Sequence, residues 1–147
     1  MVSPTTDAAL DLANDLRPVV LRVARQLRKE TEQFGVTSRQ ATLLAVVKAS
    51  PGLTLRALAE SEAISAPALS EQVDRLERAG LLRRLRSEVD RRRVGLELTP
   101  EGERLLRSIR ERRTVWLAER LSALEPDALR AIEAAIGPLR ELLEESL

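Results

Sequence analysis

Residues 54–99, TLRALAESEAISAPALSEQVDRLERAGLLRRLRSEVDRRRVGLELT, decide the fold of this chain. The first part of the stretch predicts two short helices, over 55–62 and 66–78, joined by the three-residue turn 63–65. A hydroxyl residue precedes each helix, where its oxygen can accept a hydrogen bond from the first helical turn. These two caps are Thr54 and Ser65. The apolar residues of the second helix recur at helical spacing and are expected to face the core: Leu69, Val73 and Leu76.

The opposite side of the second helix is polar and is expected to face outward. It carries Ala68, Ser70, Glu71, Gln72 and Arg75. The serine and glutamine side chains can hydrogen-bond to base edges, and the arginine can reach a guanine or a phosphate. Ser65, together with the free N–H groups at the helix start, suits a phosphate. The alternative is an ordinary helix pair in a bundle, with a polar face that is only solvated.

After residue 81 the pattern changes to that of a β-hairpin. Val94, Leu96 and Leu98 alternate with small or polar residues, and the segment 87–93 before them is polar and charged. Within 83–93 six arginines stand against two acids. Such a hairpin is typical of a wing that lies along a phosphate backbone or enters a narrow A·T-rich minor groove. The alternative is a charged edge hairpin protected against aggregation. The acid Asp90 is expected to orient the hairpin tip through a short ion pair.

Helices are expected on both sides of this stretch. A long amphipathic helix over 7–33 contains Pro18, which should kink it or split it at 15–17, and a second helix runs from Thr37 or Ser38 to about residue 49. Pro100 opens a long helix with Thr99 as its cap, and a final helix after Pro126 should be interrupted at Gly137-Pro138. The predicted fold is mainly α with one small β-hairpin.

Composition narrows the function further. Residues 38–99 hold eleven basic and eight acidic side chains, a net of +3, whereas the rest of the chain has a net of −2. A basic middle favours a polyanion as partner. The chain has no Cys and no His, which excludes disulfides, thiol nucleophiles and Cys/His metal sites. No apolar run approaches the ~20 residues of a membrane helix, and the start lacks a signal-peptide pattern, so a cytoplasmic protein is expected.

Seven segments in this order resemble the MarR (multiple antibiotic resistance regulator) family. The most specific is the Asp-Arg-Arg tip followed by Leu-Thr-x-x-Gly. The segments are 37–40, 55–59, 64–70, 73–82, Arg84, 90–93 and 96–102. The chain departs from the family at Ala63, where a glycine is common, so this residue is expected to adopt an ordinary rather than a left-handed conformation.

The resemblance implies a winged helix-turn-helix fold with N- and C-terminal dimerisation helices. The DNA-binding domain would comprise 37–99, and 1–36 with 100–147 would form the dimerisation region of a homodimer on a pseudo-palindromic double-stranded operator. By position, the groove-reading and wing residues would be Ser65, Pro67, Ala68, Ser70, Gln72, Arg75, Asp90 and Arg92. Residues at or beside helix starts and in the hairpin complete the expected DNA contacts: Ser38, Arg39, Thr54, Arg86, Arg91 and Arg93.

Many relatives of this kind release DNA when a small aromatic acid binds or when a cysteine is oxidised. The absence of Cys excludes the thiol switch, so a small-molecule effector or no effector remains. Arg17, Phe34 and Trp116 are candidate ligand contacts, and the alternative is that they are a solvated arginine and core filler. The function predicted is a transcriptional regulator acting as a repressor. The competing hypothesis is a non-catalytic winged-helix module that binds an acidic protein. No grouping of residues points to an enzyme, a cofactor or a metal.

Overall fold

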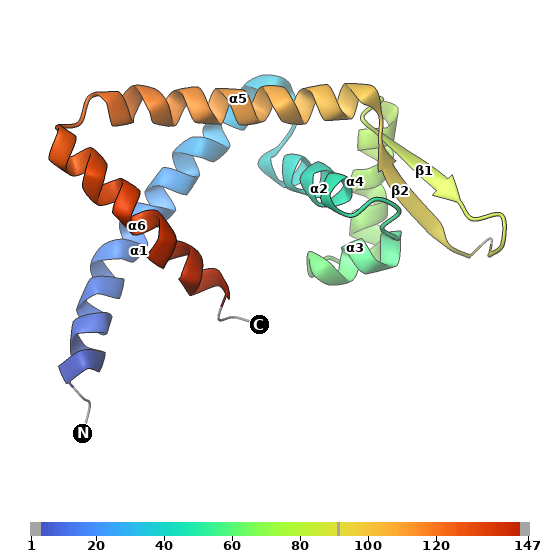
Figure 1. Cartoon of the computed structure of the whole chain (residues 1–147). Coiled ribbons are helices and arrows are strands. Elements are labelled where there is room, and N and C mark those ends of the chain that lie inside the picture. The colour runs from blue at the N-terminus through green and yellow to red at the C-terminus, as the bar shows by residue number, and fades with distance from the viewer. Residues whose placement is uncertain (1–3, 91, 145–147) are drawn as a thin grey trace. The chain divides into compact units, whose positions relative to one another are not determined.

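The computed structural model describes residues 4–90 and 92–144 and divides the chain into two compact units, Met1–Arg113 and Thr114–Leu147. The first unit contains α1 (Pro4–Thr31), a 3₁₀ turn η1 (Glu32–Phe34), α2 (Ser38–Ala49), α3 (Leu55–Ser61), α4 (Ala66–Arg78), β1 (Leu82–Arg86) and β2 (Val94–Leu98) (Figure 1). Helix α5 (Pro100–Ser122) crosses the boundary, and α6 (Pro126–Glu144) belongs to the second unit. The prediction of a mainly α fold with one small hairpin is confirmed.

The helix starts lie where the hydroxyl caps placed them. The Thr54 side chain accepts from the N–H of Ala57, and the Ser65 side chain accepts from the N–H of Ala68. Of the two candidates for α2, Thr37 is the cap: its side chain accepts from the N–H of Gln40, whose side chain accepts in return from the N–H of Thr37. This reciprocal pair is a capping box, which satisfies two backbone donors at once.

The helix breaks expected at two prolines do not occur, whereas the alternative expectation for Pro18, a kink, stays a prediction. Helix α1 is not split at 15–17 but continues through Pro18, and α6 is not interrupted at Gly137-Pro138. A proline removes only one backbone hydrogen bond from a helix. Most neighbours of Pro138 are Ala, Leu, Arg or Glu, which favour helix strongly, and Leu16, Arg17, Leu21 and Arg22 provide such residues on both sides of Pro18, so the flanking turns keep each helix continuous.

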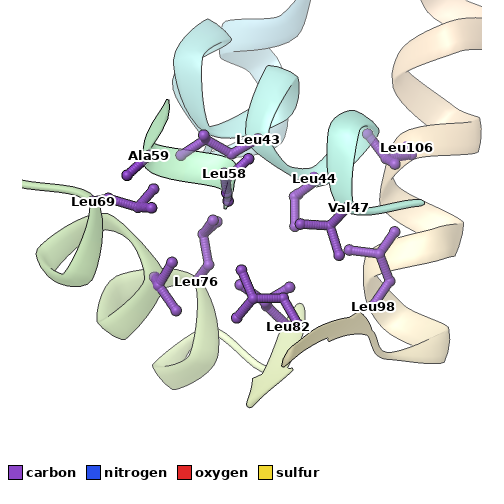
Figure 2. Close-up of a cluster of buried hydrophobic side chains, with 12 residues drawn as sticks. Leu43, Leu44, Val47, Leu58, Ala59, Leu69, Leu76, Leu82, Leu98 and Leu106 are labelled. Atoms are coloured by element: carbon purple, nitrogen blue, oxygen red, sulfur yellow. The ribbon is translucent and has the colours of Figure 1, made fainter. Parts of the chain in front are cut away.

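The core of the first unit lies where α2, α3 and α4 meet the hairpin. Leu58, Leu69, Leu76 and Leu82 point toward one another from three different elements (Figure 2). The strands pair antiparallel with Leu82 opposite Leu98 and Arg86 opposite Val94, and the N–H of Leu96 donates to the carbonyl of Leu53 at 2.9 Å. Strand β2 is therefore fixed to the loop before α3. The tip of the hairpin extends beyond the helices (Figure 1).

Helix α5 begins in close contact with the turn between α4 and β1. The Thr99 hydroxyl donates to the carbonyl of Gly80 at 2.5 Å and accepts from the N–H of Gly102 at 3.1 Å. A Cβ at Gly102 would lie 2.1 Å from the carbonyl oxygen of Leu81, so only glycine fits there. The Leu-Thr-x-x-Gly segment thus joins the hairpin to α5 by a cap and a close backbone approach.

Further along, α5 is tied to α1 by two adjacent arginines. The Arg113 guanidinium donates to the hydroxyl of buried Thr31 at 2.5 Å and to the carbonyl of Leu27 at 3.3 Å. Arg112 pairs with Glu30 at 2.8 Å. Among the described residues, no helix is long and apolar enough to cross a bilayer.

Candidate nucleic-acid interface

The turn between α3 and α4 has a defined helix-ending geometry. The N–H of Ile64 donates to the carbonyl of Ala59 at 3.0 Å, and the N–H of Ala63 donates to the carbonyl of Glu60 at 3.3 Å. These two bonds form a Schellman motif, whose residue after the cap must be left-handed. Ala63 occupies that position with a φ of 51°, so the expectation of an ordinary conformation is wrong. The hydrogen bonds of the turn, not the residue type, fix the backbone there.

Helix α4 buries the predicted apolar face and leaves the predicted outward face accessible. Leu69, Val73 and Leu76 are buried. Pro67, Ala68, Glu71 and Arg75 are exposed, while Ser70 and Gln72 are half-buried at its two flanks. Arg75 pairs with Glu71 at 2.7 Å on the exposed face, so it must exchange this partner to contact a base or phosphate.

On one flank of α4, the hairpin is tied to the helix by Arg84. Its guanidinium lies 2.7 Å from carboxylate oxygens of both Asp74 and Glu77, and it donates to the hydroxyl of Ser70 at 3.4 Å. Burial lowers the pKa of Arg84, but the hydrogen bonds to Asp74 and Glu77 outweigh this and raise the pKa above its ordinary value. Arg84 is therefore a structural cation that positions the hairpin.

On the other flank, α4 is tied to α2 by a pair of glutamines. The Nε2 of Gln40 donates to the Oε1 of Gln72 at 3.2 Å. Gln40 is the side chain already held by the capping box at Thr37. The outward face of α4 is consequently fixed between a charged contact and a neutral one.

The hairpin tip, residues 87–93, is ordered by its own side chains. The Ser87 hydroxyl accepts from the N–H groups of Val89 and Asp90, and the Asp90 carboxylate accepts from the N–H of Arg92 at 3.0 Å. In the part of the tip that the structure describes, Asp90 therefore acts on the backbone, where an ion pair was expected. Arg91 lies outside the described residues.

The charge of the hairpin is concentrated toward the tip. Arg83 pairs with Glu97 at 3.6 Å, and Arg84 is occupied by Asp74 and Glu77. Arg86, Arg92 and Arg93 are exposed and have no ion pair within the described part of the chain. Two of the six arginines counted in the sequence are thus neutralised by neighbours at the root of the hairpin.

A groove of about 1080 Å³ separates the hairpin tip from α3 and the start of α4. Five of the sequence-predicted residues line it, namely Thr54, Ser70, Asp90, Arg92 and Arg93. The groove also includes Arg56, which sequence reasoning missed. Its position two residues after the Thr54 cap was the available signal, because it places a cation in the first turn of α3.

The remaining predicted residues surround this groove or lie apart from it. Ser65, Pro67, Ala68, Gln72 and Arg75 belong to α4 or its cap, Ser38 and Arg39 lie at the start of α2, and Arg86 ends β1. The candidate ligand residues have separate neighbours. Arg17 donates to Asn14 on its own helix, Phe34 packs with Val36, Ala41 and Ile109, and the Trp116 ring lies 3.9 Å from the Arg120 guanidinium carbon.

Three comparisons place this arrangement among known proteins. The model of the MarR family matches residues 36–94. An uncharacterised HTH-type transcriptional regulator of Mycobacterium leprae is 32% identical over 95% of this chain and 98% of its own length. The HTH-type transcriptional repressor MdtR of Bacillus subtilis is 30% identical over 81% of this chain and 77% of its own length. A solved MarR family protein from Bacillus stearothermophilus superposes with a TM-score of 0.77 at 25% identity, covering 99% of both chains.

Proposed function

Because the chain belongs to the MarR family of winged helix-turn-helix transcriptional regulators, we propose that it represses transcription as a homodimer on a pseudo-palindromic operator. One observation carries the assignment of the DNA-contacting face: the start of α4 and the arginine-bearing tip line the same groove. Repression, as opposed to activation, is supported by the relative MdtR, which is named a repressor.

In the proposed complex, α4 enters the major groove and the hairpin acts as the wing. A B-DNA major groove is about 12 Å wide and admits one helix. One phosphate backbone would then pass through the groove between α4 and the tip, beside Thr54, Arg56 and Arg92. The Ser65-capped start of α4 offers N–H groups to a phosphate, and Arg75, released from Glu71, reaches a guanine or the backbone.

Dimerisation is proposed to use 1–36 together with 100–147, leaving 37–99 as the DNA-binding domain. Helix α1 exposes Leu12 (64%), Val19 (59%) and Leu21 (58%), and α6 exposes Leu129, Ile132, Ile136 and Leu142. Apolar rows of this extent mark association surfaces in water-soluble proteins. A two-fold axis would place the two α4 helices about 34 Å apart, one turn of DNA.

An effector remains a secondary proposal. A small aromatic acid would use Arg17 for its carboxylate and Phe34 or Trp116 for its ring. The alternative is a regulator without an effector, in which these residues only pack or remain solvated. Loss of operator binding on adding salicylate to the wild type, but not to an Arg17→Ala variant, would support the ligand switch. Unchanged binding would favour the alternative.

The test of the proposed function is a selection from random duplexes followed by titrations of the enriched site by fluorescence anisotropy. We expect a palindromic consensus, a stoichiometry of two chains per duplex and an affinity that falls steeply with salt. Arg92→Ala and Arg93→Ala should weaken binding to all sequences and reduce the salt dependence. Arg110→Ala, an exposed arginine of α5 outside the groove, is the matched control. If no sequence is enriched while an acidic protein partner binds tightly, the chain is instead a protein-interaction module.

A further inference from the structure

A hydrogen bond from Gln40 of α2 determines which end of the Gln72 side chain of α4, the amide oxygen or the NH₂ group, is free. Gln72 accepts a hydrogen bond at its Oε1 from the Nε2 of Gln40, across 32 residues of sequence. Gln40 in turn accepts from the backbone N–H of Thr37 at 3.0 Å, and its own N–H donates to the Thr37 hydroxyl at 3.1 Å. The three residues form a short relay from the cap of α2 to the side of α4.

The relay determines which end of each amide points where. An amide oxygen and nitrogen have nearly the same shape, so only their partners distinguish them. The N–H of Thr37 can only donate, so the atom of Gln40 that it meets must be the oxygen Oε1. The other atom of Gln40 is then the NH₂ nitrogen, which is a donor. Gln72 must therefore meet it with its own oxygen.

The free end of Gln72 is consequently an NH₂ group. Within the described residues this nitrogen has no hydrogen-bond partner, and the same part of the chain contains no buried side-chain nitrogen or oxygen without one. The NH₂ group of Gln72 is therefore accessible to solvent from the half-buried flank of α4. It offers two N–H donors and no acceptor.

We propose that Gln72 determines specificity at one position of each half-site by selecting guanine, and that Gln40 acts as its positioning residue. This proposal rests on the proposed function. A glutamine with both ends free pairs with adenine by donating to N7 and accepting from N6. Gln72 does not present both ends in this way, because its oxygen is directed toward Gln40 and only its NH₂ end is free. Guanine presents the two acceptors N7 and O6 side by side in the major groove, which match two donors.

The variant Gln40→Glu reverses the direction of the hydrogen bond between residues 40 and 72 and leaves Gln72 itself unchanged. Glutamate is as good as glutamine at this position of a capping box, so the start of α2 is retained. The new carboxylate offers Gln72 only acceptors, so the Gln72 amide turns its NH₂ inward and its oxygen outward. We expect the preference at that base pair to move from guanine to adenine or cytosine, which carry amino donors, by about tenfold.

Two further variants separate this effect from charge and from folding. Thr42→Glu adds the same charge at an exposed position of α2 and leaves Gln40 in place. It should weaken binding equally for all sequences and preserve guanine. Gln40→Ala frees both ends of Gln72 and should shift the preference toward adenine. Circular dichroism and the unfolding midpoint establish that each variant is folded.

The readout is the base preference obtained by selection from random duplexes, with wild type and Gln72→Ala in parallel. Loss of one guanine preference in Gln72→Ala and its exchange in Gln40→Glu support the proposal. If the wild type enriches an operator but Gln72→Ala keeps every preference, Gln72 and Gln40 only link two helices, and the proposal fails while the DNA-binding function stands. A guanine preference that persists in Gln40→Glu overturns it as well. If the wild type enriches no sequence, the proposed function itself fails.

Discussion

Ala63 and Gly80 occupy the same position in two copies of one helix-ending motif. Exchanging their residue types measures how much free energy the left-handed backbone costs an alanine there. Both follow a helix cap, and their φ angles are 51° and 76°. At the end of α4 the N–H of Leu81 donates to the carbonyl of Leu76 and the N–H of Gly80 to that of Glu77, both at 3.0 Å. The equivalent bonds at the end of α3 hold Ala63.

The variant Ala63→Gly should stabilise the folded chain. A left-handed conformation costs an alanine about 1–2 kcal/mol, and this strain disappears with glycine. The added freedom of glycine in the unfolded chain costs about 0.4–1 kcal/mol in return. Ala63 is exposed, so removing its methyl group sacrifices no core packing. The net gain is about 0.5–1 kcal/mol, which for a chain of this length raises the melting temperature by about 1–4 °C.

Gly80→Ala should change stability by a similar amount in the opposite direction. A Cβ at Gly80 would meet no heavy atom within 4 Å, so the change reports the same two backbone effects with no steric clash added. The two sites lie at opposite ends of the sequence segment that contains the 13-residue helix α4. They are therefore about 20 Å apart at 1.5 Å per residue. At that distance the two effects should add, and the double variant should unfold close to the wild type.

Thermal and urea unfolding followed by circular dichroism measures these differences at one fixed protein concentration, because the stability of the proposed dimer would depend on concentration. Ala79→Gly is the control: Ala79 is exposed with an ordinary φ of −75°, so glycine relieves nothing and should destabilise by about 0.5–1 kcal/mol. If Ala63→Gly destabilises the chain as much as Ala79→Gly does, Ala63 carries no strain and the reasoning is refuted.

Three further predictions concern contacts that hold the proposed DNA-contacting face in place. Gly102→Ala should lower the free energy of unfolding in urea by about 1–3 kcal/mol, because its Cβ would lie 2.1 Å from the Leu81 carbonyl oxygen. A decrease of less than about 0.5 kcal/mol would contradict the close approach. Asp90→Ala should weaken operator binding by loosening the tip, whereas Asp90→Asn keeps an oxygen for the Arg92 N–H and should bind at least as well as wild type; equal loss in both would assign the effect to charge. The pKa of Glu101 is lowered by a hydrogen bond from its own backbone N–H, with Arg104 adding to the effect. Its ionised form therefore favours the folded state above about pH 4.3, and this contribution is lost as the pH falls through the lowered folded-state pKa. Glu101→Gln should show a smaller loss of stability between about pH 5 and pH 3 than wild type, and parallel pH profiles would exclude the contribution.

Local signals in the sequence were sufficient to predict the elements of the proposed DNA-binding face. The caps Thr54 and Ser65 and the apolar spacing of α4 act over three or four residues, and each appears in the structure as expected. The alternation of Val94, Leu96 and Leu98 likewise placed β2 correctly, because side chains of a half-buried strand alternate whatever surrounds them.

What the sequence did not provide depends on contacts between distant residues. The backbone of Ala63 follows from hydrogen bonds of the whole turn, which outweigh the preference of a single alanine. Arg84 resembled any other wing arginine until the fold placed Asp74 and Glu77 beside it. Pro18 shows that a local signal can also mislead: a proline usually breaks a helix, yet α1 continues through it.

The contacts on the two flanks of α4 also explain why the net charge of the chain is a poor measure of its affinity for DNA. Arg83 is paired with Glu97, and Arg84 is paired with Asp74 and Glu77. The root of the hairpin therefore contributes little positive electrostatic potential at the position of a phosphate. Counterion release depends on cations that reach phosphates, not on the total. Arg84→Gln would lower the formal charge by one, yet its main effect should be to free Asp74 and Glu77 and to detach the hairpin from α4. The affinity for DNA should therefore fall more in Arg84→Gln than in Arg83→Gln, which removes the same charge from an exposed ion pair. Equal losses of affinity would show that Arg84 contributes only its charge and does not position the hairpin.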